Sequence, residues 1–264
     1  KKHTLRKHNH SRNDPYYWLQ KSDNSTLIQN INQKTNDYFC DTDSLQQTLI
    51  QEIKDKTFED DKSILTKYKK YYYFSEIKQN ENYGKAYVKK TKGGKPYCYF
   101  NPEKLSKNKK QFTIGSPIIS YDESYLLYSV DYTGDRKYTL YLKKLFSHKS
   151  EKLFQYQISN DYLFHLNNHS FYYLKLNHKI RPYQLYLYDF LTKKNTMIYE
   201  ETNEEYSLSL SLSTDEQVIF LYSSAYEHDN VYQIDDTDLL ELLIQKRKNE
   251  YQIDHYQNKF YLLT

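Results

Sequence analysis

This sequence has few of the residues that build cross-linked or membrane-spanning proteins. Its 264 residues include five glycines, five prolines, one methionine, one tryptophan and only two cysteines, Cys40 and Cys98. Two cysteines do not make a disulfide framework, so we expect a reduced, cytoplasmic setting. No stretch approaches the roughly 18 consecutive apolar residues of a membrane span. The basic residues 1–10 have no apolar run behind them, so we expect no signal peptide and no membrane partner.

Tyrosine takes the place of aliphatic residues in this composition. The chain has 32 tyrosines; without them, and with glycine counted, the apolar share is about 28%, against about 45–50% in ordinary globular chains. A tyrosine ring packs well in a core, but its hydroxyl requires a hydrogen-bond partner. Aromatic residues favour half-buried sheet positions, so the composition indicates β-structure rather than disorder.

The charges are nearly balanced, with 38 basic and 34 acidic residues and a net charge of +4. This balance favours a mixed surface over a dedicated polyanion binder. The run Lys67-Tyr68-Lys69-Lys70-Tyr71 interleaves bases with rings, as platforms for single-stranded nucleic acid do. However, Lys and Tyr are frequent throughout the chain and nearby acids offset the charge, so we expect no nucleic-acid partner.

The first part of the chain has a helical pattern. Residues 26–29 and 44–47 fit the capping-box pattern of a helix start, and Leu45, Leu49 and Ile53 then follow at helical spacing. We predict two helices with a break near residues 41–43, followed by a charged linker at 59–62. Residues 1–65 are therefore assigned to a helical N-terminal segment.

From residue 66 onward, short aromatic and β-branched runs recur. Their centres are 55, 45, 47 and 41 residues apart, which is the spacing of propeller blades; the marker residues are Tyr73, Tyr128, Tyr173, Phe220 and Tyr261. A second strand is predicted in each period, over residues 85–89, 138–142, 184–188 and 230–234. We predict a mainly β domain over 66–264. One conflict stays open: Leu239, Leu240, Leu242, Leu243 and Ile244 have a helical pattern where the repeat requires strand or loop.

Several segments in the same order resemble oligopeptidase B and the wider prolyl oligopeptidase family. Residues 8–19, His8-Asn9-His10-Ser11-Arg12-Asn13-Asp14-Pro15-Tyr16-Tyr17-Trp18-Leu19, are similar to its opening H-G-x-x-R-x-D-P-Y-Y-W-L, with Asn9 in place of the usual glycine. Residues 120–131, followed by Tyr138-Thr139-Leu140, resemble the family blade S-P-D-x-x-x-L-A-Y-S-x-D…Y-T-L, with Tyr121 in place of proline. Residues 181–184, 198–201 and 254–261 continue the correspondence.

The resemblance implies a fold and a partner. It implies an N-terminal segment packed against an α/β-hydrolase domain, and a seven-bladed propeller that limits entry to short peptides, which are cut after basic residues. This chain would supply an incomplete β-propeller of about four blades and the first strand of a fifth, ending inside a blade. The acidic groups that select basic residues would lie in the hydrolase domain. Asp14, Pro15, Tyr16, Tyr17 and Trp18 are expected to anchor the segment against its neighbour as packing residues.

No catalytic, cofactor-binding or metal-binding residue is predicted in this chain. A serine nucleophile elbow needs Gly-x-Ser-x-Gly, and Ile114-Gly115-Ser116-Pro117 lacks the second glycine. Asp254-His255 has no partner serine on the same scaffold, so a blade position is the simpler interpretation. Further candidates were weighed against structural roles: His3, His8 and His10 as a basic terminus, Cys40 as a small packed residue, and the pairs Asp60-Asp61, Glu200-Glu201 and Asp235-Asp236 as solvated turns.

Three hypotheses follow from these observations. The first is the non-catalytic, peptide-gating portion of a serine oligopeptidase, inactive by itself. The second is a stand-alone propeller-like interaction module, which requires a closed ring or capped ends, because an open sheet edge promotes aggregation. The third is a split or decayed gene product without activity. A Gly-x-Ser-x-Gly coding pattern in the DNA just downstream would separate these hypotheses.

Overall fold

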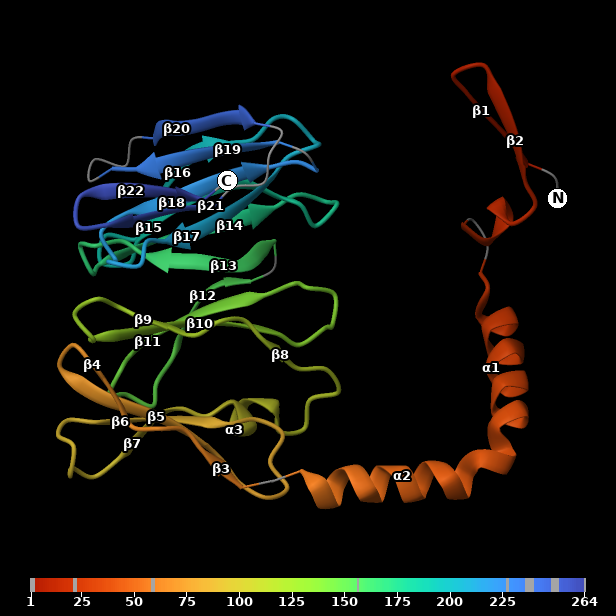
Figure 1. Ribbon diagram of the computed structural model, residues 1–264, viewed down its shortest axis with the longest axis horizontal. Helices are drawn as coiled ribbons and strands as arrows, with labels where there is room; N and C mark the ends of the chain where they lie inside the picture. Colours follow the sequence, from red (N-terminus) through yellow and green to blue (C-terminus); the bar gives the residue numbers. More distant parts are fainter. Residues whose placement is uncertain are drawn as a thin grey trace. The chain divides into compact units, whose positions relative to one another are not determined.

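The computed structural model describes residues 3–20, 23–57, 60–155, 157–226, 228–235, 240–247 and 252–263. The chain forms two compact units, Lys1–Glu59 and Asp60–Thr264 (Figure 1). None of the described helices is long and apolar enough to cross a membrane.

The first unit is a hairpin followed by helices. Strands β1 (His3–Lys7) and β2 (His10–Asp14) pair antiparallel, a 3-10 turn follows at Tyr17–Gln20, and α1 (Ser25–Phe39) and α2 (Asp43–Lys56) are joined by the 3-10 turn Cys40–Thr42. The predicted break near residues 41–43 is therefore confirmed. Asn9 has a φ of 61°, in the left-handed region where glycine is favoured and Asn is better tolerated than most residues.

Both helices begin earlier than the capping boxes predict. The N-cap residues are Asn24 and Thr42, not Thr26 and Ser44, and neither caps its helix through its side chain. Before α1 the turn is closed by Asp23, whose carboxylate accepts a 2.9 Å hydrogen bond from the Ser25 amide. Before α2 the hydroxyl of Thr42 donates to the carbonyl of Phe39, and the 3-10 turn Cys40–Thr42 leads directly into α2, so the second helix has no extended N-cap residue.

The second unit consists of four antiparallel blades and a hairpin. Blade 1 contains β3 (Asp61–Lys62), β4 (Thr66–Tyr68), β5 (Tyr71–Ile77), β6 (Lys85–Lys89) and β7 (Tyr97–Phe100), followed by the short helix α3 (Pro102–Ser106). Blade 2 contains β8 (Thr113–Ile114), β9 (Ile118–Ile119), β10 (Tyr125–Asp131), β11 (Thr139–Lys144) and β12 (Glu151–Gln155).

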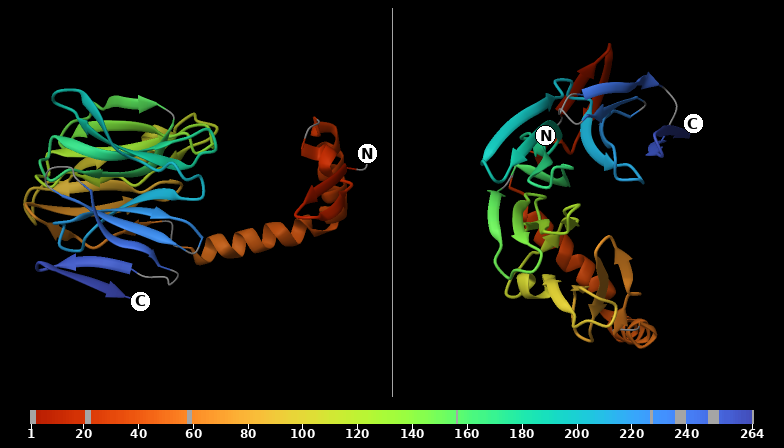
Figure 2. Two further views of the ribbon diagram at one scale, coloured as in Figure 1. Left: turned by 90° about the horizontal axis from the view of Figure 1, so that it is seen from above. Right: turned by 90° about the vertical axis from the view of Figure 1, so that its left-hand side faces the viewer.

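The remaining blades follow in the same order. Blade 3 contains β13 (Ile158–Phe164), β14 (Ser170–Leu176), β15 (Pro182–Asp189) and β16 (Lys194–Glu200). Blade 4 contains β17 (Ser207–Leu212), β18 (Ile219–Ser224), β19 (Asp229–Ile234) and β20 (Leu240–Arg247). The hairpin pairs β21 (Gln252–Tyr256) with β22 (Lys259–Leu263). The blades succeed one another along an arc (Figure 2).

The blade period and the mainly β, partial-propeller fold class are confirmed. In blades 1 and 2 the first strand is interrupted, since β3 and β4 both pair with β5, and β8 and β9 both pair with β10. With each of these pairs counted as one first strand, all five marker residues lie on the second strand of a sheet, β5, β10, β14, β18 or β22. Tyr261 is thus on the second strand after blade 4, where the sequence predicted only a first strand. The expected linker is also shorter than predicted, because Asp61–Lys62 already pairs with Ile77 and Glu76 of β5.

The segment with conflicting patterns is a strand. Leu240–Arg247 forms β20 and pairs with β19, with Val231 opposite Ile244 and register shifts on both sides of Val231; Leu239 lies outside the described residues. Ile244 is buried beside Val218, Phe220 and Val231. The bulged register and the apolar layer reconcile a helix-like spacing of leucines with a strand, because a register shift changes which residues face the core.

Each pair of neighbouring sheets encloses an apolar layer. Along β14, Phe171 and Tyr173 pack with Leu127 and Leu140 of blade 2, while the alternate residues Tyr172 and Leu174 pack with Leu208 and Leu221 of blade 4. Successive side chains of a strand point to opposite faces, so a sheet between two others is apolar on both faces. This explains why the predicted strands lack polar alternation.

Candidate functional site

The turns between the first and second strands of the blades, called here the first turns, contain polar side chains that bond to neighbouring blades. In blades 2 and 4 they have the same sequence pattern, Ser120-Tyr121-Asp122-Glu123 and Ser213-Thr214-Asp215-Glu216. In each, the serine hydroxyl donates to the aspartate, at 2.7 and 2.8 Å. The glutamates have φ values of 59° and 58°, so the two turns share one backbone geometry.

Glu123 joins blade 2 to blade 1. Its side chain is 2% exposed and accepts hydrogen bonds from the Lys70 amide at 2.7 Å and from the Tyr73 hydroxyl at 2.9 Å. Burial and the contact with Glu123 together raise the pKa of Tyr73 well above its usual value. The buried carboxylate therefore fixes the β4–β5 turn of the neighbouring blade.

Glu216 reaches from blade 4 to blade 1. Its carboxylate accepts a 2.8 Å hydrogen bond from the Tyr68 hydroxyl and lies 2.7 Å from the ammonium of Lys69. The same ammonium lies 4.7 Å from the centre of the Tyr121 ring in blade 2. Burial opposes the charge on Lys69, but hydrogen bonds to Glu216 and Tyr68 outweigh it and raise its pKa. Three blades thus meet at one ammonium group.

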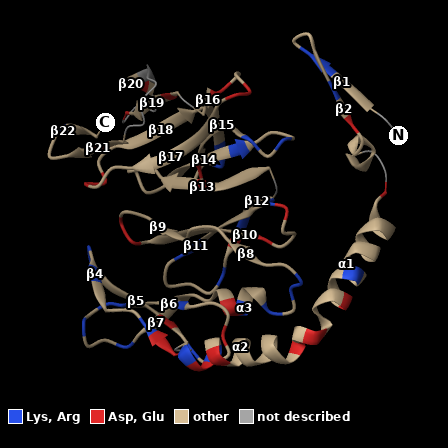
Figure 3. Ribbon diagram, turned by 45° about the vertical axis from the view of Figure 1, so that its right-hand side comes forward, with Lys and Arg blue, Asp and Glu red and all other residues tan. Residues whose placement is uncertain are grey.

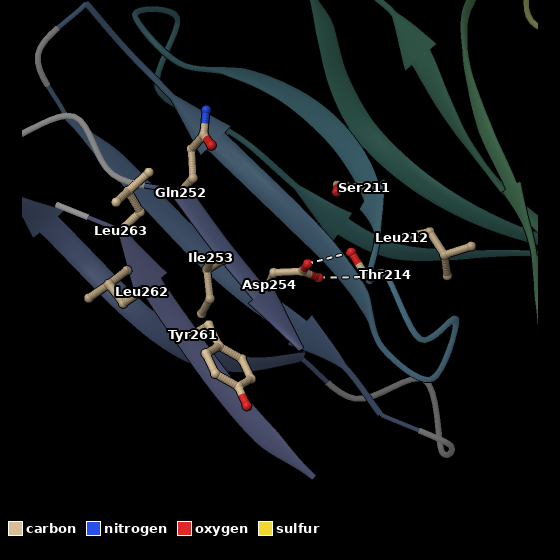
Figure 4. A pocket seen from close by; sticks show the side chains of 9 residues that line it. All are labelled: Ser211, Leu212, Thr214, Gln252, Ile253, Asp254, Tyr261, Leu262 and Leu263. Atoms are coloured by element: carbon tan, nitrogen blue, oxygen red, sulfur yellow. Dashed lines mark hydrogen bonds between the residues drawn. The ribbon is translucent and has the colours of Figure 1, made fainter. Parts of the chain in front are cut away.

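The pair Asp254-His255 ties the hairpin to the first turn of blade 4. Asp254 accepts hydrogen bonds from the amide of Thr214 at 2.9 Å and from its hydroxyl (Figure 4). His255 is 7% exposed, and its Nδ1 lies 3.0 Å from Asp215 Oδ2. A cavity of about 550 Å³ lies beside these residues, between β17 and the hairpin.

Ser213, Asp215 and His255 lie together but in the wrong order for nucleophilic catalysis. In a serine triad the histidine takes the proton of the serine, and the aspartate orients the histidine from its other side. Here the Ser213 hydroxyl donates its hydrogen bond to Asp215 rather than to His255, while its oxygen accepts from the Val218 amide at 2.9 Å. Burial opposes the ionisation of Asp215, but the bonds from His255 and Ser213 hold its pKa below the usual value. The cluster stabilises a turn and has no activated hydroxyl.

The nearest lookalike of a nucleophile elbow has a packing role. Gly115 lies between β8 and β9, and a Cβ atom there would stand 2.1 Å from the Ser129 Oγ. The carbonyl of the next residue, Ser116, accepts a 2.7 Å hydrogen bond from Tyr162 of blade 3. The glycine is required by close packing against Ser129 of its own blade and against Asn160 of blade 3, whose Cβ would stand 3.0 Å from the new atom, and not by a strand-to-helix turn.

The segment 14–18 forms a compact turn with exposed rings. Asp14 accepts a 2.9 Å hydrogen bond from the Tyr16 amide, and Tyr17 stacks on His3 with ring centroids 3.5 Å apart. Tyr16 is 68% exposed and Trp18 is 41% exposed. The turn therefore presents aromatic surface, as an anchoring segment would, while its role as an anchor stays a prediction.

Helices α1 and α2 expose large apolar side chains. Neither helix has a buried residue. On α2 the apolar residues Leu45, Leu49, Ile50 and Ile53 recur at helical spacing and are all exposed, Ile53 by 65%. A connected apolar stripe on a helix normally packs against another surface.

The other residues weighed from the sequence lie apart from one another. Among the described residues, no three His, Cys, Asp or Glu side chains form a group that could hold a metal ion. Cys40 is exposed, with its thiol 3.0 Å from the Asp37 carbonyl, so its expected packing role is wrong. Cys98 is partly buried, and burial raises its pKa.

The carboxylate pairs and the Lys–Tyr run also have structural roles. Glu201 was expected in a solvated turn but is buried, where its carboxylate accepts from Ser223 of blade 4 and, at 3.1 Å, from Tyr199. Asp60 accepts from the Gln79 amide at 2.6 Å, and Asp236 lies outside the described residues.

The run 67–71 forms β4 and the following turn, held by Glu123 and Glu216. Charges of both signs are spread over the chain (Figure 3).

Sequence reasoning missed the roles of the two glutamates at the first turns, Glu123, which is buried, and Glu216, which is partly exposed. The repeated pattern Ser-x-Asp-Glu at 120–123 and 213–216 was available as a signal. A repeat that recurs at equivalent positions of two blades indicates one structural role, although the partner strand of each glutamate is visible only in three dimensions.

The amino-acid sequence of this chain is similar to those of known proteins. Residues 1–264 match the family described as prolyl oligopeptidase, N-terminal beta-propeller domain. Protease 2 of Moraxella lacunata is 23% identical over 97% of this chain, which spans 40% of that protein.

Solved structures agree with that match. Oligopeptidase B from Trypanosoma brucei, in its closed form with covalently bound antipain, superposes with a TM-score of 0.80 at 17% identity over 97% of this chain and 40% of its own. Oligopeptidase B from Leishmania major gives a TM-score of 0.78 at 17% identity, over 93% of this chain and 37% of its own. The matching segments, the blade order and the full-length family match together assign this chain to the N-terminal β-propeller family of the prolyl oligopeptidases.

Proposed function

We propose that this chain is the peptide-gating portion of an oligopeptidase B-like serine peptidase. In this proposal the blades limit access of short peptides to a Ser-Asp-His site on an α/β-hydrolase domain, which lies outside residues 1–264 and cuts after basic residues. The chain contributes no catalytic residue, no cofactor and no metal. Its partner is that hydrolase domain, in the same chain or encoded separately, and its compartment is the cytoplasm.

The observation that carries the proposal is the exposed apolar stripe of α2. The blades bury their own cores between sheets, whereas Leu45, Leu49 and Ile53 are 58%, 47% and 65% exposed. Covering such a stripe is favourable by about 25 cal/mol per Å² of apolar surface. A hydrolase domain packed on this segment, as the family resemblance implies, would bury it.

Gating requires a propeller wall that does not open between blades. Buried carboxylates cross two of the blade boundaries: Glu123 bonds to the backbone of blade 1, and Glu201 of blade 3 bonds to Ser223 of blade 4. Each bond of this kind is expensive to break, because a buried charged group without a partner loses its solvation. These bonds support a rigid barrier that excludes folded proteins.

The test is a chimera in which residues 1–264 replace the matching 40% of Moraxella lacunata Protease 2. We expect the chimera to cleave a short dibasic fluorogenic peptide but not casein, and the chain alone to cleave neither. Cleavage of the peptide by the chain alone, blocked by a serine-directed phosphonate, would contradict the proposal. Equal cleavage of peptide and casein by the folded chimera would contradict the gating role.

A pair of variants tests the helix contact in the same chimera. Leu49→Lys places a charge on the apolar stripe and should lower the thermal transition and the peptidase activity together. Gln47→Lys makes the same change outside the stripe, on an exposed side chain of the same helix, and should change neither. Equal effects of the two variants would argue against the stripe as the contact.

A further inference from the structure

A basic groove lies between blades 2 and 3, at the end of the blades opposite the first turns. Two surface depressions meet there, of about 770 Å³ and 390 Å³, and both are lined by Leu176 and Ile180. One wall is the β10–β11 loop with Arg136 and Lys137, and the other is the end of β14 and the loop after it, with Lys175 and His178. We call these two depressions the blade 2–3 groove.

The charged side chains that line this groove are all basic. Arg136, Lys137 and Lys175 line it together with His178, and no Asp or Glu is among its lining residues. The chain as a whole is nearly balanced, with 38 basic and 34 acidic residues, so the groove departs from the average surface. Basic colour at the end of β14 and in the loop after it is visible in Figure 3. A concave surface of one charge concentrates ligands of the opposite charge.

The two loops that form the walls are held in place by internal hydrogen bonds. In the β10–β11 loop, the buried Asp131 accepts from the amides of Thr133 at 2.7 Å and of Arg136 at 2.8 Å. In the β14–β15 loop, the Asn177 side chain accepts from the amides of Lys179 and Arg181, at 2.9 and 3.1 Å. Since the walls are ordered before a ligand arrives, little conformational entropy is lost on binding.

The cations differ in how far they are already neutralised. Lys137 lies 3.1 Å from Asp135, and both side chains are more than half exposed, so this pair exchanges readily with an incoming anion. Lys175 lies 5.8 Å from the centre of the Tyr186 ring and, in the described part of the chain, has no ion-pair partner. The apolar side chains of Leu176 and Ile180 separate the positive groups.

We propose that the blade 2–3 groove binds an acidic peptide segment, in which spaced carboxylates contact Lys137, Lys175 and Arg136 while intervening apolar side chains contact Ile180. A single small anion would satisfy only part of this array, because the cations line two joined depressions. The inference concerns binding to this chain and does not depend on the peptidase proposal.

The test is calorimetric titration of the full chain with the capped hexapeptide Ac-Glu-Leu-Glu-Leu-Glu-Leu-NH₂ and its Gln counterpart at low salt. We expect the Glu peptide to bind at least tenfold more tightly and to weaken as salt rises, since exposed charges are screened. Lys137→Gln and Lys175→Gln should each weaken binding up to about fivefold, as expected for exposed ion pairs. The matched variant Lys194→Gln, on an exposed side chain of β16, should leave binding unchanged.

Asp135→Asn gives a prediction of the opposite sign, which damage to the fold cannot imitate. Removal of the carboxylate releases Lys137, so the Glu peptide should bind more tightly to this variant. Equal binding of the Glu and Gln peptides, or an equal loss in Lys194→Gln, would overturn the proposal. Inorganic phosphate serves as a second probe, and complete displacement of the Glu peptide by equimolar phosphate would reduce the groove to a simple anion site and overturn the peptide assignment.

Discussion

Glu216 accepts a hydrogen bond from the hydroxyl of Tyr68, 148 positions earlier in the chain, over 2.8 Å. The bond joins the first turn of blade 4 to that of blade 1, and the ammonium of Lys69 lies 2.7 Å from the same carboxylate. Such a contact closes a very long loop, and the conformational entropy lost in closing it must be offset by the packing of the intervening blades. The contact fixes the position of the fourth blade relative to the first.

Glu216→Gln should weaken this contact without changing the shape of the side chain. Lys69 and Glu216 are about a third exposed, so solvent screening limits the loss to about 1 kcal/mol, or about 2–4 °C in the thermal transition. The control Glu204→Gln breaks the pair with Lys179, in which both side chains are more than half exposed, and should have almost no effect. Thermal unfolding followed by circular dichroism measures both, and equal shifts would contradict a special role for Glu216.

Asp161→Asn should stabilise the protein at neutral pH. Asp161 on β13 accepts a 2.8 Å hydrogen bond from the Leu210 amide, and burial raises its pKa from 3.8 to about 6. Between these values the folded state keeps a proton that the unfolded state releases, so this group lowers stability as the pH rises from about 4 to 6. Asn keeps the acceptor for Leu210 without the buried charge.

The expected gain for Asp161→Asn is about 3 kcal/mol at pH 8 and close to zero at pH 4, because a shift of one pKa unit corresponds to about 1.4 kcal/mol. Urea unfolding at the two pH values measures the difference between variant and parent. A gain that is the same at both pH values would show that the charge of Asp161 is not its cause.

Asp131→Ala should have the opposite pH dependence. Burial opposes the ionisation of Asp131, but hydrogen bonds from the hydroxyl and amide of Thr133 and from the Arg136 amide outweigh it and hold its pKa below 3.8. The variant should lose about 2–3 kcal/mol at pH 7, because these donors lose a charged acceptor. The loss should shrink in acid, where the parent carboxylate is protonated. Asp135→Ala, in the same loop but exposed, is the control in the same urea measurements and should be nearly neutral.

Gly115→Ala should be strongly destabilising, by about 3 kcal/mol, because the new methyl group would overlap the Ser129 Oγ at 2.1 Å. Ser129→Ala in the same chain removes that oxygen and should recover part of the loss. Gly93→Ala is the matched control, since nothing lies within 4 Å of a Cβ there. Denaturant unfolding of the three variants provides the measurement, and the absence of any rescue would place the strain elsewhere.

Periodicity predicted the blades well because each blade repeats the same arrangement of buried inner strands. Strand residues such as Tyr73, Tyr128 and Tyr173 recur where a second strand must bury both faces, and this requirement appears directly as composition and spacing. The helix starts were less predictable: Thr26 and Ser44 fit a capping pattern, but Asp23 and the 3-10 turn at residues 40–42 closed the turns earlier. The hydrogen bonds that close the preceding turns therefore decided which polar residue precedes each helix.

The conflict at Leu240–Ile244 could not be resolved from sequence, because a helix and a bulged strand use the same leucines. The unpaired edge of β19 decided the outcome, since β20 pairs along it and buries Ile244 against Val231. That edge exists only after the preceding strands have formed, which no local pattern contains.

The sequence by itself determined the repeat, the mainly β architecture, the helical N-terminal segment and the lack of a Gly-x-Ser-x-Gly motif, because each depends on composition or short-range spacing. Tertiary structure decided which polar residues hold neighbouring blades together. Glu123, Glu201 and Glu216 resemble ordinary surface carboxylates in sequence, yet Glu123 and Glu201 are buried, and Glu216 bonds across blades. Their partners lie on other blades, far away in the sequence. Only the folded chain brings these groups within hydrogen-bonding distance, so no local sequence pattern predicts the contacts.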